Sequence, residues 1–178
     1  HLSDDTTNNK KKILVLGYLN HIKNQNEIIE ISKKVSDLNL DFRLVYSNYN
    51  RNYKKNLEIL IKNNNIQNIK LINHNQTEIE REIKDCWLML NVSITEVMPL
   101  SLLEGMFYKK PFLSLKVGSI HKLEGGLVNH NIMQLIHNLK NLYFNKDMYI
   151  NLSNLGKEQI TRKYNYENLK KLISKTIK

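Results

Sequence analysis

The sequence predicts an α/β protein in which a parallel sheet of about six strands is covered by helices on both faces, in three layers. Two observations support this fold class. Short apolar runs alternate along the chain with segments whose apolar residues recur at helical spacing. The length of 178 residues, of which 41% are hydrophobic, is enough for one domain with a substantial core.

The start of the chain contains a polar leader, a strand and a helix. Residues 1–11 are polar and lack periodicity, which is typical of a disordered leader or the end of an interdomain linker. The apolar run Ile13–Leu16 predicts the first strand, which ends at Gly17. Asn24 and Glu27 have the spacing of a helix N-cap pair. The helix that they open is expected to bury Ile28, Ile31, Val35 and Leu38.

Two further strand and helix pairs follow. Apolar runs predict strands over Phe42–Tyr46 and Ile69–Ile72. After the third strand, Thr77–Glu80 has the form of a capping box that opens a short charged helix. His74 has no evident partner and is expected to be a solvated loop histidine. The helix between the second and third strands is marked by Leu57, Leu60 and Ile61.

The segment 86–115 predicts a strand, a loop, a helix and another strand. Cys86–Val92 is apolar enough for one buried strand, and a polar loop over 93–96 follows it. Pro99 is expected to open the helix, because its missing N–H costs nothing at the first helical position. Lys109–Lys110 are expected to close the helix at its negative end. The apolar stripe of this helix contains Leu102, Leu103, Met106 and Phe107.

The last third of the chain predicts two strands and three helices. An apolar run from Pro111 predicts the fifth strand, and Leu127–Val128 predict a short sixth strand after a glycine pair. Two final helices are predicted over Met148–Tyr164 and Tyr166–Ile177. The helix between them and the sixth strand is marked by Ile132, Leu135, Ile136 and Leu139.

The helix predicted from Pro99 has the features of a binding site. The N–H groups of a first helical turn have no partner within the helix, and such an end attracts phosphate. Glu104 lies five residues further on, about 7.5 Å along the helix axis. Glu96 lies in the preceding loop, and carboxylates accept hydrogen bonds from hydroxyls. A ligand with an anionic middle and hydroxyl-rich ends, such as a sugar nucleotide, would suit this arrangement.

Glu96 and Glu104, with VMPLSLL between them, resemble the E-x7-E segment of the retaining glycosyltransferases of family 4, the glycosyl transferases group 1 domain. A preceding strand, PL at the junction, LLEGM on the helix and a following KKP extend the similarity, which covers the chain from Ile13 to about Leu172. The resemblance implies a Rossmann-like, nucleotide-sugar-binding domain over residues 12–178. Such a domain is the C-terminal, donor-binding half of a GT-B architecture.

The resemblance also implies roles for the turn after the first strand. The segment LGYLNHIKNQNEII is similar to the first strand and loop of the family, normally G-R-x-x-x-x-K, where the arginine and the lysine hold the donor diphosphate. Gly17 and Lys23 match the family's glycine and lysine. Tyr18 stands at the arginine position, and Asn20 and His21 are the polar residues beside it.

Further donor contacts follow from the same resemblance. Glu104 is expected to bind the ribose hydroxyls, and Glu96 the donor-sugar hydroxyls near the reacting carbon. Glu96 and Lys23 are therefore the expected catalytic residues. Ile72 and Asn73 are expected to flank the base, mainly through their backbone. The sugar and the phosphates would be cradled by the backbone of Met98, Pro99, Leu100 and Ser101.

The implied reaction moves a hexose-type sugar from a nucleoside diphosphate to a glycan or lipid-linked acceptor. The acceptor would be bound by an N-terminal domain that this chain does not match, so the domain alone is expected to bind donor but transfer little sugar. GT-B enzymes generally stabilise the departing diphosphate with cations and helix N-termini, and the sequence shows no metal-ligand spacing. We therefore expect no metal, no cofactor and a cytoplasmic protein, at the inner membrane face if the acceptor is lipid-linked.

The net charge of +10 is compatible with nucleic acid, an anionic lipid surface or a polyanionic substrate. The abundance of Lys, Asn and Ile is also typical of AT-rich genomes and needs no functional cause. Residues 140–178 carry nine Lys or Arg and three Asp or Glu. The charge leaves two alternatives: a basic nucleic-acid-binding module and a membrane-surface module. Half of a nucleotide-sugar epimerase, an enzyme with the same two-domain fold, is a third alternative. No nucleic-acid-binding motif accompanies the charge, so no such partner is expected.

The single cysteine, Cys86, excludes an internal disulfide and is expected in the core.

Overall fold

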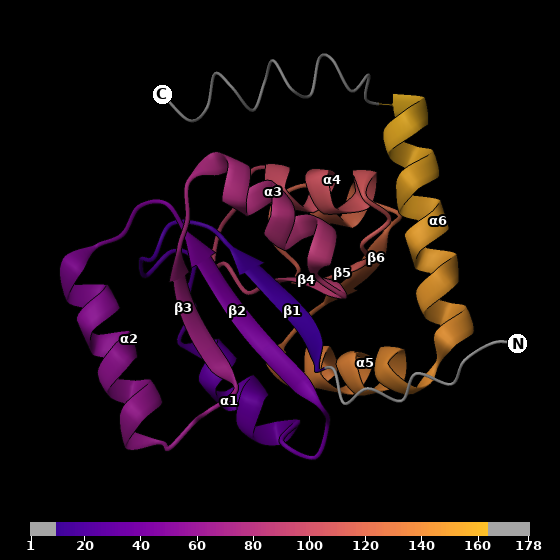
Figure 1. The fold of residues 1–178 in the computed structure, drawn as a ribbon. Coiled ribbons are helices and arrows are strands. Elements are labelled where there is room, and N and C mark those ends of the chain that lie inside the picture. The colour runs from indigo at the N-terminus through magenta and orange to yellow at the C-terminus, as the bar shows by residue number, and fades with distance from the viewer. Residues whose placement is uncertain (1–9, 164–178) are drawn as a thin grey trace, which may run out of the picture.

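The computed structural model describes residues 10–163, which form a six-stranded parallel sheet with helices on both faces (Figure 1). The strand order is β3-β2-β1-β4-β5-β6, and every neighbouring pair is parallel. This arrangement confirms the predicted fold class. The strands are β1 (Lys11–Leu16), β2 (Leu40–Tyr46), β3 (Ile69–Asn73), β4 (Leu88–Asn91), β5 (Phe112–Leu115) and β6 (Gly126–Asn129).

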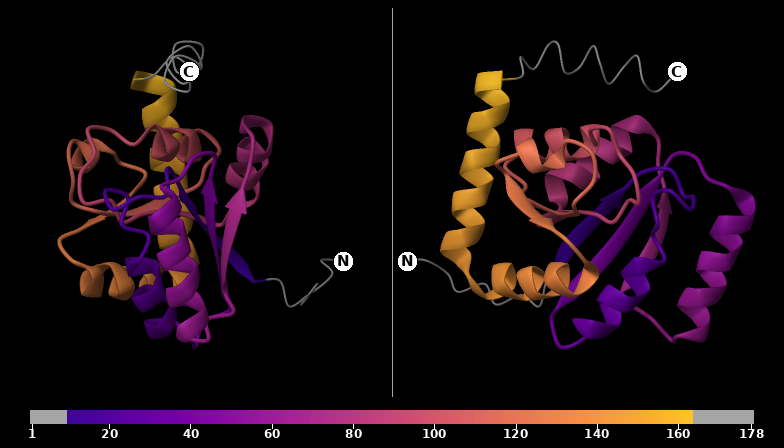
Figure 2. Two further views of the ribbon diagram at one scale, coloured as in Figure 1. Left: turned by 90° about the vertical axis from the view of Figure 1, so that its left-hand side faces the viewer. Right: turned by 180° about the vertical axis from the view of Figure 1, so that it is seen from behind.

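The helices form the two outer layers, as the views from the side and from behind also show (Figure 2). One face of the sheet is covered by α1 (Glu27–Lys34), α2 (Arg51–Asn63) and α5 (Ile132–Phe144). The opposite face is covered by α3 (Gln76–Asp85), α4 (Leu100–Phe107) and the short 3-10 helix η1 (Ile120–Lys122). The last described helix, α6 (Lys146–Lys163), runs along the β6 edge, with Leu152 in one core and Ile160 in the other.

The strands are buried on both faces, because successive residues of a strand point to opposite sides of the sheet. In β1, Ile13 and Val15 pack into the core under α1, α2 and α5, whereas Leu14 packs into the core under α3 and α4. In β4, Leu90 and Met89 divide in the same way. This two-sided burial explains why the strands read as continuous apolar runs in the sequence instead of alternating ones.

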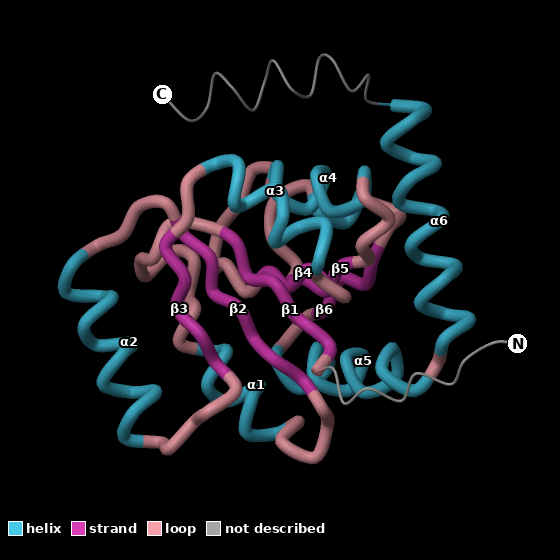
Figure 3. Tube along the Cα trace, viewed as in Figure 1, coloured by secondary structure: helices cyan, strands magenta, loops and turns pink. Residues whose placement is uncertain are grey.

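The strand order places a change of direction between β1 and β4, at the centre of the sheet. The chain leaves β1 towards α1 on one face and leaves β4 towards α4 on the other. In open parallel sheets, ligands bind outside the carboxyl ends of the strands at such a point. The loops that follow β1, β2 and β3 gather at that end of the sheet (Figure 3).

The structure corrects two predicted helix caps. Asn24 adopts a left-handed conformation with φ of 54°, and α1 begins only after Asn26, so Asn24 is not its N-cap. The capping box of α3 is made by Asn75 and Glu78: each side chain accepts from the other's backbone N–H, at 3.1 and 2.9 Å. The predicted Thr77–Glu80 pair therefore lies within α3.

Both ends of α4 also differ from the prediction. The helix begins at Leu100, and Pro99 is its N-cap rather than its first residue. It ends at Phe107, so Lys109–Lys110 lie beyond the helix and do not form its last turn. Lys109 has a φ of 57°, and the Lys110 N–H donates to the Gly105 carbonyl at 2.8 Å. This backbone arrangement satisfies the last carbonyls of the helix in place of a lysine side chain.

The first strand begins earlier than expected, because Lys11 pairs with β2 instead of belonging to a leader. Its ammonium lies 4.6 Å from the ring centre of Trp87 and 4.1 Å from that of Tyr143, and it donates to the Tyr143 carbonyl at 3.1 Å. Residues 1–9 of the predicted leader and the helix predicted over Tyr166–Ile177 lie outside the described residues. Cys86 is buried as expected, after the end of α3, and burial raises the pKa of its thiol to about 12.

Candidate functional site

An ion pair joins the loops that follow the two central strands. The Lys23 ammonium, in the loop after β1, binds Oε1 of Glu96, in the loop after β4. The two side chains are 27% and 13% exposed, so the pair is only partly solvated. The structure thus brings together two residues that lie 73 positions apart and were both expected in the donor site.

Gly17 allows Lys23 to lie across the end of β1. Its φ of 155° is a conformation that side-chain-bearing residues rarely adopt, and a Cβ there would sit 3.3 Å from Cε of Lys23. The turn between them is fixed by Asn20, whose Oδ1 accepts from the Lys23 N–H at 2.9 Å. The glycine and the asparagine therefore orient the lysine.

Backbone contacts on two sides hold the loop that carries Glu96. The Ile94 N–H donates to the Ile22 carbonyl at 2.8 Å, which links this loop to the one after β1. The Val97 carbonyl accepts from both the N–H and the hydroxyl of Ser119, at 3.1 and 2.7 Å. Gly118 packs so closely that a Cβ there would lie 1.9 Å from the Glu96 carbonyl oxygen. The loop after β5 thus fixes the backbone at Glu96.

We expect the Gly118→Ala variant to be destabilised by about 2 kcal/mol or more, because alanine is strained at a φ of 50° and its methyl group would meet backbone atoms. Urea unfolding of this variant and the wild-type protein measures the difference. Lys116→Ala, an exposed change two residues away, is the control and should leave the stability nearly unchanged. Equal stability of the three proteins would show that the close contact between Gly118 and the Glu96 carbonyl does not hold the loop after β4.

A row of buried and half-buried polar side chains lies behind Glu96. The Ser93 hydroxyl lies 3.1 Å from Oε1 of Glu96 and 2.8 Å from Oδ1 of Asn91, whose amide donates to the Ser114 hydroxyl at 2.9 Å. None of these three residues was predicted from the sequence to belong to the site. The sequence does carry one signal for them: each of three successive apolar strands has a polar residue at or near its carboxyl end, namely Asn91, Ser114 and Asn129.

Glu104 carries a half-buried carboxyl group on α4 that has no hydrogen bond or ion pair with any residue in the range 10–163. Burial raises its pKa to about 7, and the nearby Glu80 carboxylate adds to the effect. The first turn of α4 has no side-chain cap, because Pro99 at the N-cap offers no side-chain acceptor. Unpaired carboxylate oxygens and uncapped amides are groups that a hydroxyl-bearing anion can bind.

The pKa of Glu104 predicts a pH-dependent gain in stability for the Glu104→Gln variant. The folded state holds the proton up to about pH 7, whereas the unfolded chain releases it near pH 4.3. Ionised Glu104 therefore lowers the stability of the wild-type protein increasingly between these values, and the loss is constant above them. The variant, which stays neutral, should be more stable by about 1–3 kcal/mol at pH 8 and show little gain at pH 4.

Urea unfolding across this pH range measures the effect, with Glu158→Gln on the exposed side of α6 as the control. A gain for Glu104→Gln that does not vary with pH would contradict the raised pKa.

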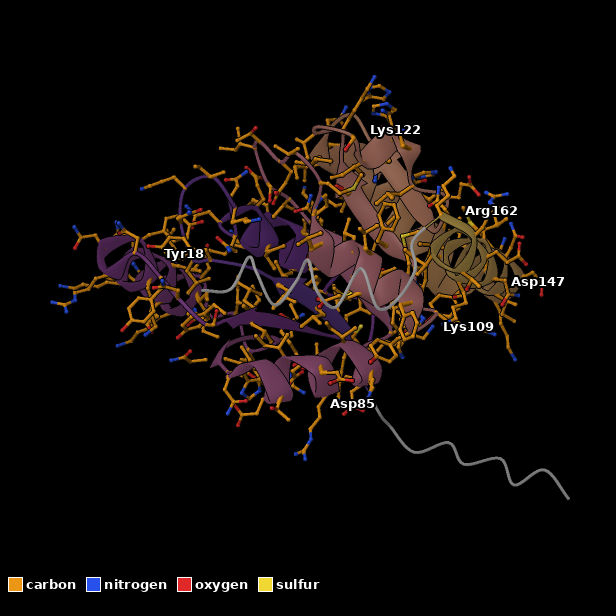
Figure 4. The ribbon with its side chains drawn as sticks, turned by 90° about the horizontal axis from the view of Figure 1, so that it is seen from above. Tyr18, Asp85, Lys109, Lys122, Asp147 and Arg162 are labelled. Atoms are coloured by element: carbon orange, nitrogen blue, oxygen red, sulfur yellow. The ribbon has the colours of Figure 1, made fainter. Side chains whose placement is uncertain are left out.

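The other residues expected at the diphosphate lie in the loop after β1 and at the start of α4. Tyr18 is 38% exposed, and it lies on the side of the molecule opposite Arg162 in the view from above (Figure 4). Its carbonyl accepts from the Gln25 side chain at 2.9 Å. The His21 ring packs edge-on against Tyr53, with 4.9 Å between ring centres. The residues at the start of α4 are partly or fully buried: Met98, Pro99, Leu100 and Ser101.

The structure corrects the expectation for His74 at the end of β3. Its Nε2 lies 3.1 Å from Oε1 of Glu82 and its Nδ1 lies 3.4 Å from Oε2 of Glu78, so it is not merely a solvated loop histidine. Glu82 also binds the Arg43 guanidinium at 2.8 Å. The two residues expected near the base precede this network on β3: Ile72 is half-buried and Asn73 is exposed.

The described residues, 10–163, also bear on metal sites and membrane spans. They contain no group of three or more His, Cys, Asp and Glu side chains placed to hold a metal ion. No helix in this part of the chain is long and apolar enough to span a bilayer.

The sequence match to a protein family and the structural matches to solved proteins agree with each other. A family profile described as glycosyl transferases group 1 matches residues 3–159, whereas no curated protein matches the chain. The C-terminal domain of LpcC, a glycosyl transferase group 1 family protein from Francisella tularensis, is similar with a TM-score of 0.77 and 19% identity, over 88% of this chain and 87% of that one.

Two longer proteins share the fold. HepE from Anabaena, solved in complex with UDP and glucose, has a TM-score of 0.81 and 15% identity over 95% of this chain and 48% of its own. TarM from S. aureus, solved with UDP among its ligands, has a TM-score of 0.78 and 21% identity over 91% of this chain and 34% of its own. This chain thus spans about half of HepE and a third of TarM.

The six-stranded parallel sheet, the helices on both faces and these structural matches identify a Rossmann-like domain of the kind that forms the C-terminal half of GT-B glycosyltransferases. The family profile covers most of the sequence, including both loops that form the Lys23–Glu96 pair. The chain therefore belongs to the glycosyl transferases group 1 family.

Proposed function

We propose that this chain is the donor-binding domain of a retaining glycosyltransferase that moves a hexose-type sugar from a nucleoside diphosphate to a glycan or lipid-linked acceptor. The observation that carries the proposal is the Lys23–Glu96 ion pair between the loops after β1 and β4. It places a cation and a carboxylate together at the point in the sheet where ligands of this fold bind. The retaining course is inferred from the resemblance of the E-x7-E segment.

Each part of a nucleotide sugar has a matching group in this site. Lys23 and the uncapped first turn of α4 would bind the diphosphate, and Gly17 would let it approach the backbone. Glu104 would accept hydrogen bonds from the ribose hydroxyls, and Glu96 from the hydroxyls of the donor sugar. Ile72 and Asn73 would flank the base, and the backbone of the segment 98–101 would support sugar and phosphate.

The rate of transfer depends on stabilising the diphosphate as it leaves, because negative charge develops on it while the sugar becomes oxocarbenium-like. Lys23 supplies a fixed positive charge for this purpose, and the helix dipole of α4 adds partial charge. Tyr18 stands where the family has an arginine and contributes no charge. We propose that no metal ion or other cofactor takes part, so the lysine and the helix end carry this role.

The acceptor side of the reaction needs a second domain. Apolar side chains around Lys23 and Glu96 are exposed on the loops after β1, β2 and β4, where a covering domain would contact them: Tyr18, Ile22, Tyr49, Ile94 and Val97. We propose that an N-terminal acceptor-binding domain lies against these loops and that residues 12–178 alone bind donor but transfer little sugar. The complete enzyme would act in the cytoplasm and, with a lipid-linked acceptor, contact anionic lipid at the inner membrane face.

Calorimetric titration tests the proposal. The chain is titrated with UDP, GDP and ADP and, separately, with a single-stranded oligonucleotide, at about 0.1 and about 0.5 M NaCl. Saturable binding of one nucleoside diphosphate that changes little with salt supports the donor-binding function. Oligonucleotide binding that falls steeply with salt, without nucleoside diphosphate binding, would favour a nucleic-acid-binding module instead.

A further inference from the structure

Ser93 contacts the Glu96 carboxylate from the buried side of the site. Ser93 follows Val92 in the loop after β4, which ends at Asn91, and it is 1% exposed. The hydroxyl oxygen lies 3.1 Å from Oε1 of Glu96, the same oxygen that binds the Lys23 ammonium. In residues 10–163, Lys23 and Ser93 are the two side chains placed to donate to this carboxylate.

Three strands fix the position of Ser93 through directed hydrogen bonds. The Ser114 hydroxyl donates to the Leu115 carbonyl at 2.8 Å, so it can accept from the Asn91 amide, 2.9 Å away. This bond turns the Asn91 carbonyl oxygen towards the Ser93 hydroxyl, at 2.8 Å. The Ser114 carbonyl in turn accepts from Asn129, on β6, at 3.1 Å. Ser114 and Asn129 are fully buried, so the row behind Ser93 cannot exchange its partners with water freely.

The two donors to Glu96 differ in what else they can bind. A lysine has three N–H donors on a flexible chain, and a diphosphate attracts them by its charge. The Ser93 hydroxyl is neutral, buried and shared only between Asn91 and Glu96 in the described part of the chain. The single proton of Ser93 lies between two acceptors, the Asn91 amide oxygen at 2.8 Å and Oε1 of Glu96 at 3.1 Å. When Lys23 engages phosphate, the ionised carboxylate is the stronger acceptor of the two, and Ser93 is the donor left to it.

We propose that Ser93 is a positioning residue that holds the Glu96 carboxylate at the donor sugar while Lys23 binds the diphosphate. This inference rests on the proposed function and adds a specific division of labour to it. Because Ser93 acts through Glu96, its removal should weaken the contact with the sugar and leave the contact with the nucleoside diphosphate intact.

The test measures dissociation constants by calorimetry for UDP, GDP, ADP and their glucose conjugates. For the nucleotide that binds the wild-type protein, Ser93→Ala should raise the dissociation constant of the glucose conjugate about tenfold and change that of the free diphosphate less than about twofold. Ser93→Cys, which keeps the volume but is a weak donor, should behave in the same way and covers the case in which the alanine variant folds poorly.

The matched control is Ser153→Ala on α6, a buried serine whose hydroxyl bonds the Tyr149 carbonyl at 2.9 Å. It should change neither constant, although it can lower the stability to urea. An equal loss for both ligands, or no loss for either, in both Ser93 variants would overturn the positioning role while the donor-binding function stands. Failure of the wild-type protein to bind any of the six ligands would overturn the proposed function, and the role of Ser93 with it.

Discussion

Replacing Lys23 with methionine should weaken nucleoside diphosphate binding by roughly thirtyfold or more. The change keeps most of the alkyl chain over Gly17 but removes the ammonium that would bind the phosphates. It also leaves Glu96, 13% exposed, without its ion-pair partner and close to an incoming anion. Both effects act in the same direction, which makes this one of the two largest expected losses. Calorimetric titration of wild-type and variant protein with the diphosphate measures it.

The control for this variant is Lys33→Met on α1. Lys33 forms an exposed ion pair with Glu30 at 2.9 Å, so its removal changes the net charge equally without touching the site. A control that loses as much affinity as Lys23→Met would show that overall charge, and not the ion pair with Glu96, governs binding.

The double variant Lys23→Met, Glu96→Gln separates the two contributions. If an unpaired carboxylate repels the diphosphate, neutralising Glu96 should restore part of the affinity lost in the single lysine variant. If the lysine acts only by binding phosphate, the double variant should bind as weakly as the single one. Either result still requires Lys23 at the diphosphate, and full affinity in the single variant would exclude that role.

Glu104→Ala should weaken nucleoside diphosphate binding by roughly tenfold to a hundredfold, because the ribose hydroxyls would lose their carboxylate acceptor. The loss should depend on the ribose. The wild-type protein should bind the nucleoside diphosphate more tightly than its 2′,3′-dideoxy analogue, and the variant should bind both equally. Titration of both proteins with both ligands measures this preference.

The control for Glu104→Ala is Glu158→Ala, which removes an exposed carboxylate from α6. It should retain the preference for ribose. A Glu104→Ala protein that still discriminates between ribose and dideoxyribose would place the sugar of the nucleoside elsewhere, and the inferred order of the donor along α4 would be wrong.

Most of the sheet could be predicted because its strands are buried on both faces and read as continuous apolar runs. The run Cys86–Val92 contains β4, and Phe42–Tyr46 contains most of β2. The strand order could not be read in the same way. It depends on which strands pair across the centre of the sheet, and β1 pairs with β4 over a separation that no local pattern reveals.

The errors at the starts of α1 and α3 share one cause. Asparagine is abundant in this chain, and it both caps helices and tolerates a positive φ. Asn24 was therefore predicted to cap α1, although it adopts a left-handed conformation, and Thr77 was preferred to Asn75, which makes the capping box of α3. Lys11 was assigned to a polar leader because its charge is typical of solvated segments, whereas its ammonium lies over the rings of Trp87 and Tyr143.

The site could be predicted in part from the spacing of Glu96 and Glu104 and from the position of Lys23. The partners of these residues could not, because they come from other strands. Ser93 and Asn91 looked like the ordinary polar end of a strand, and only the structure shows the row that they form with Ser114. His74 likewise gained its partners from the folding of α3 beside β2, which places Glu82 between it and Arg43.

The most direct test of the donor site is a crystal structure of the chain with its preferred nucleoside diphosphate bound. We expect the diphosphate within hydrogen-bond distance of the Lys23 ammonium and the start of α4, with the ribose hydroxyls on the Glu104 carboxylate. A nucleotide bound away from this end of the sheet, for example at the surface between α5 and α6 around Lys140 and Phe144, would contradict the account.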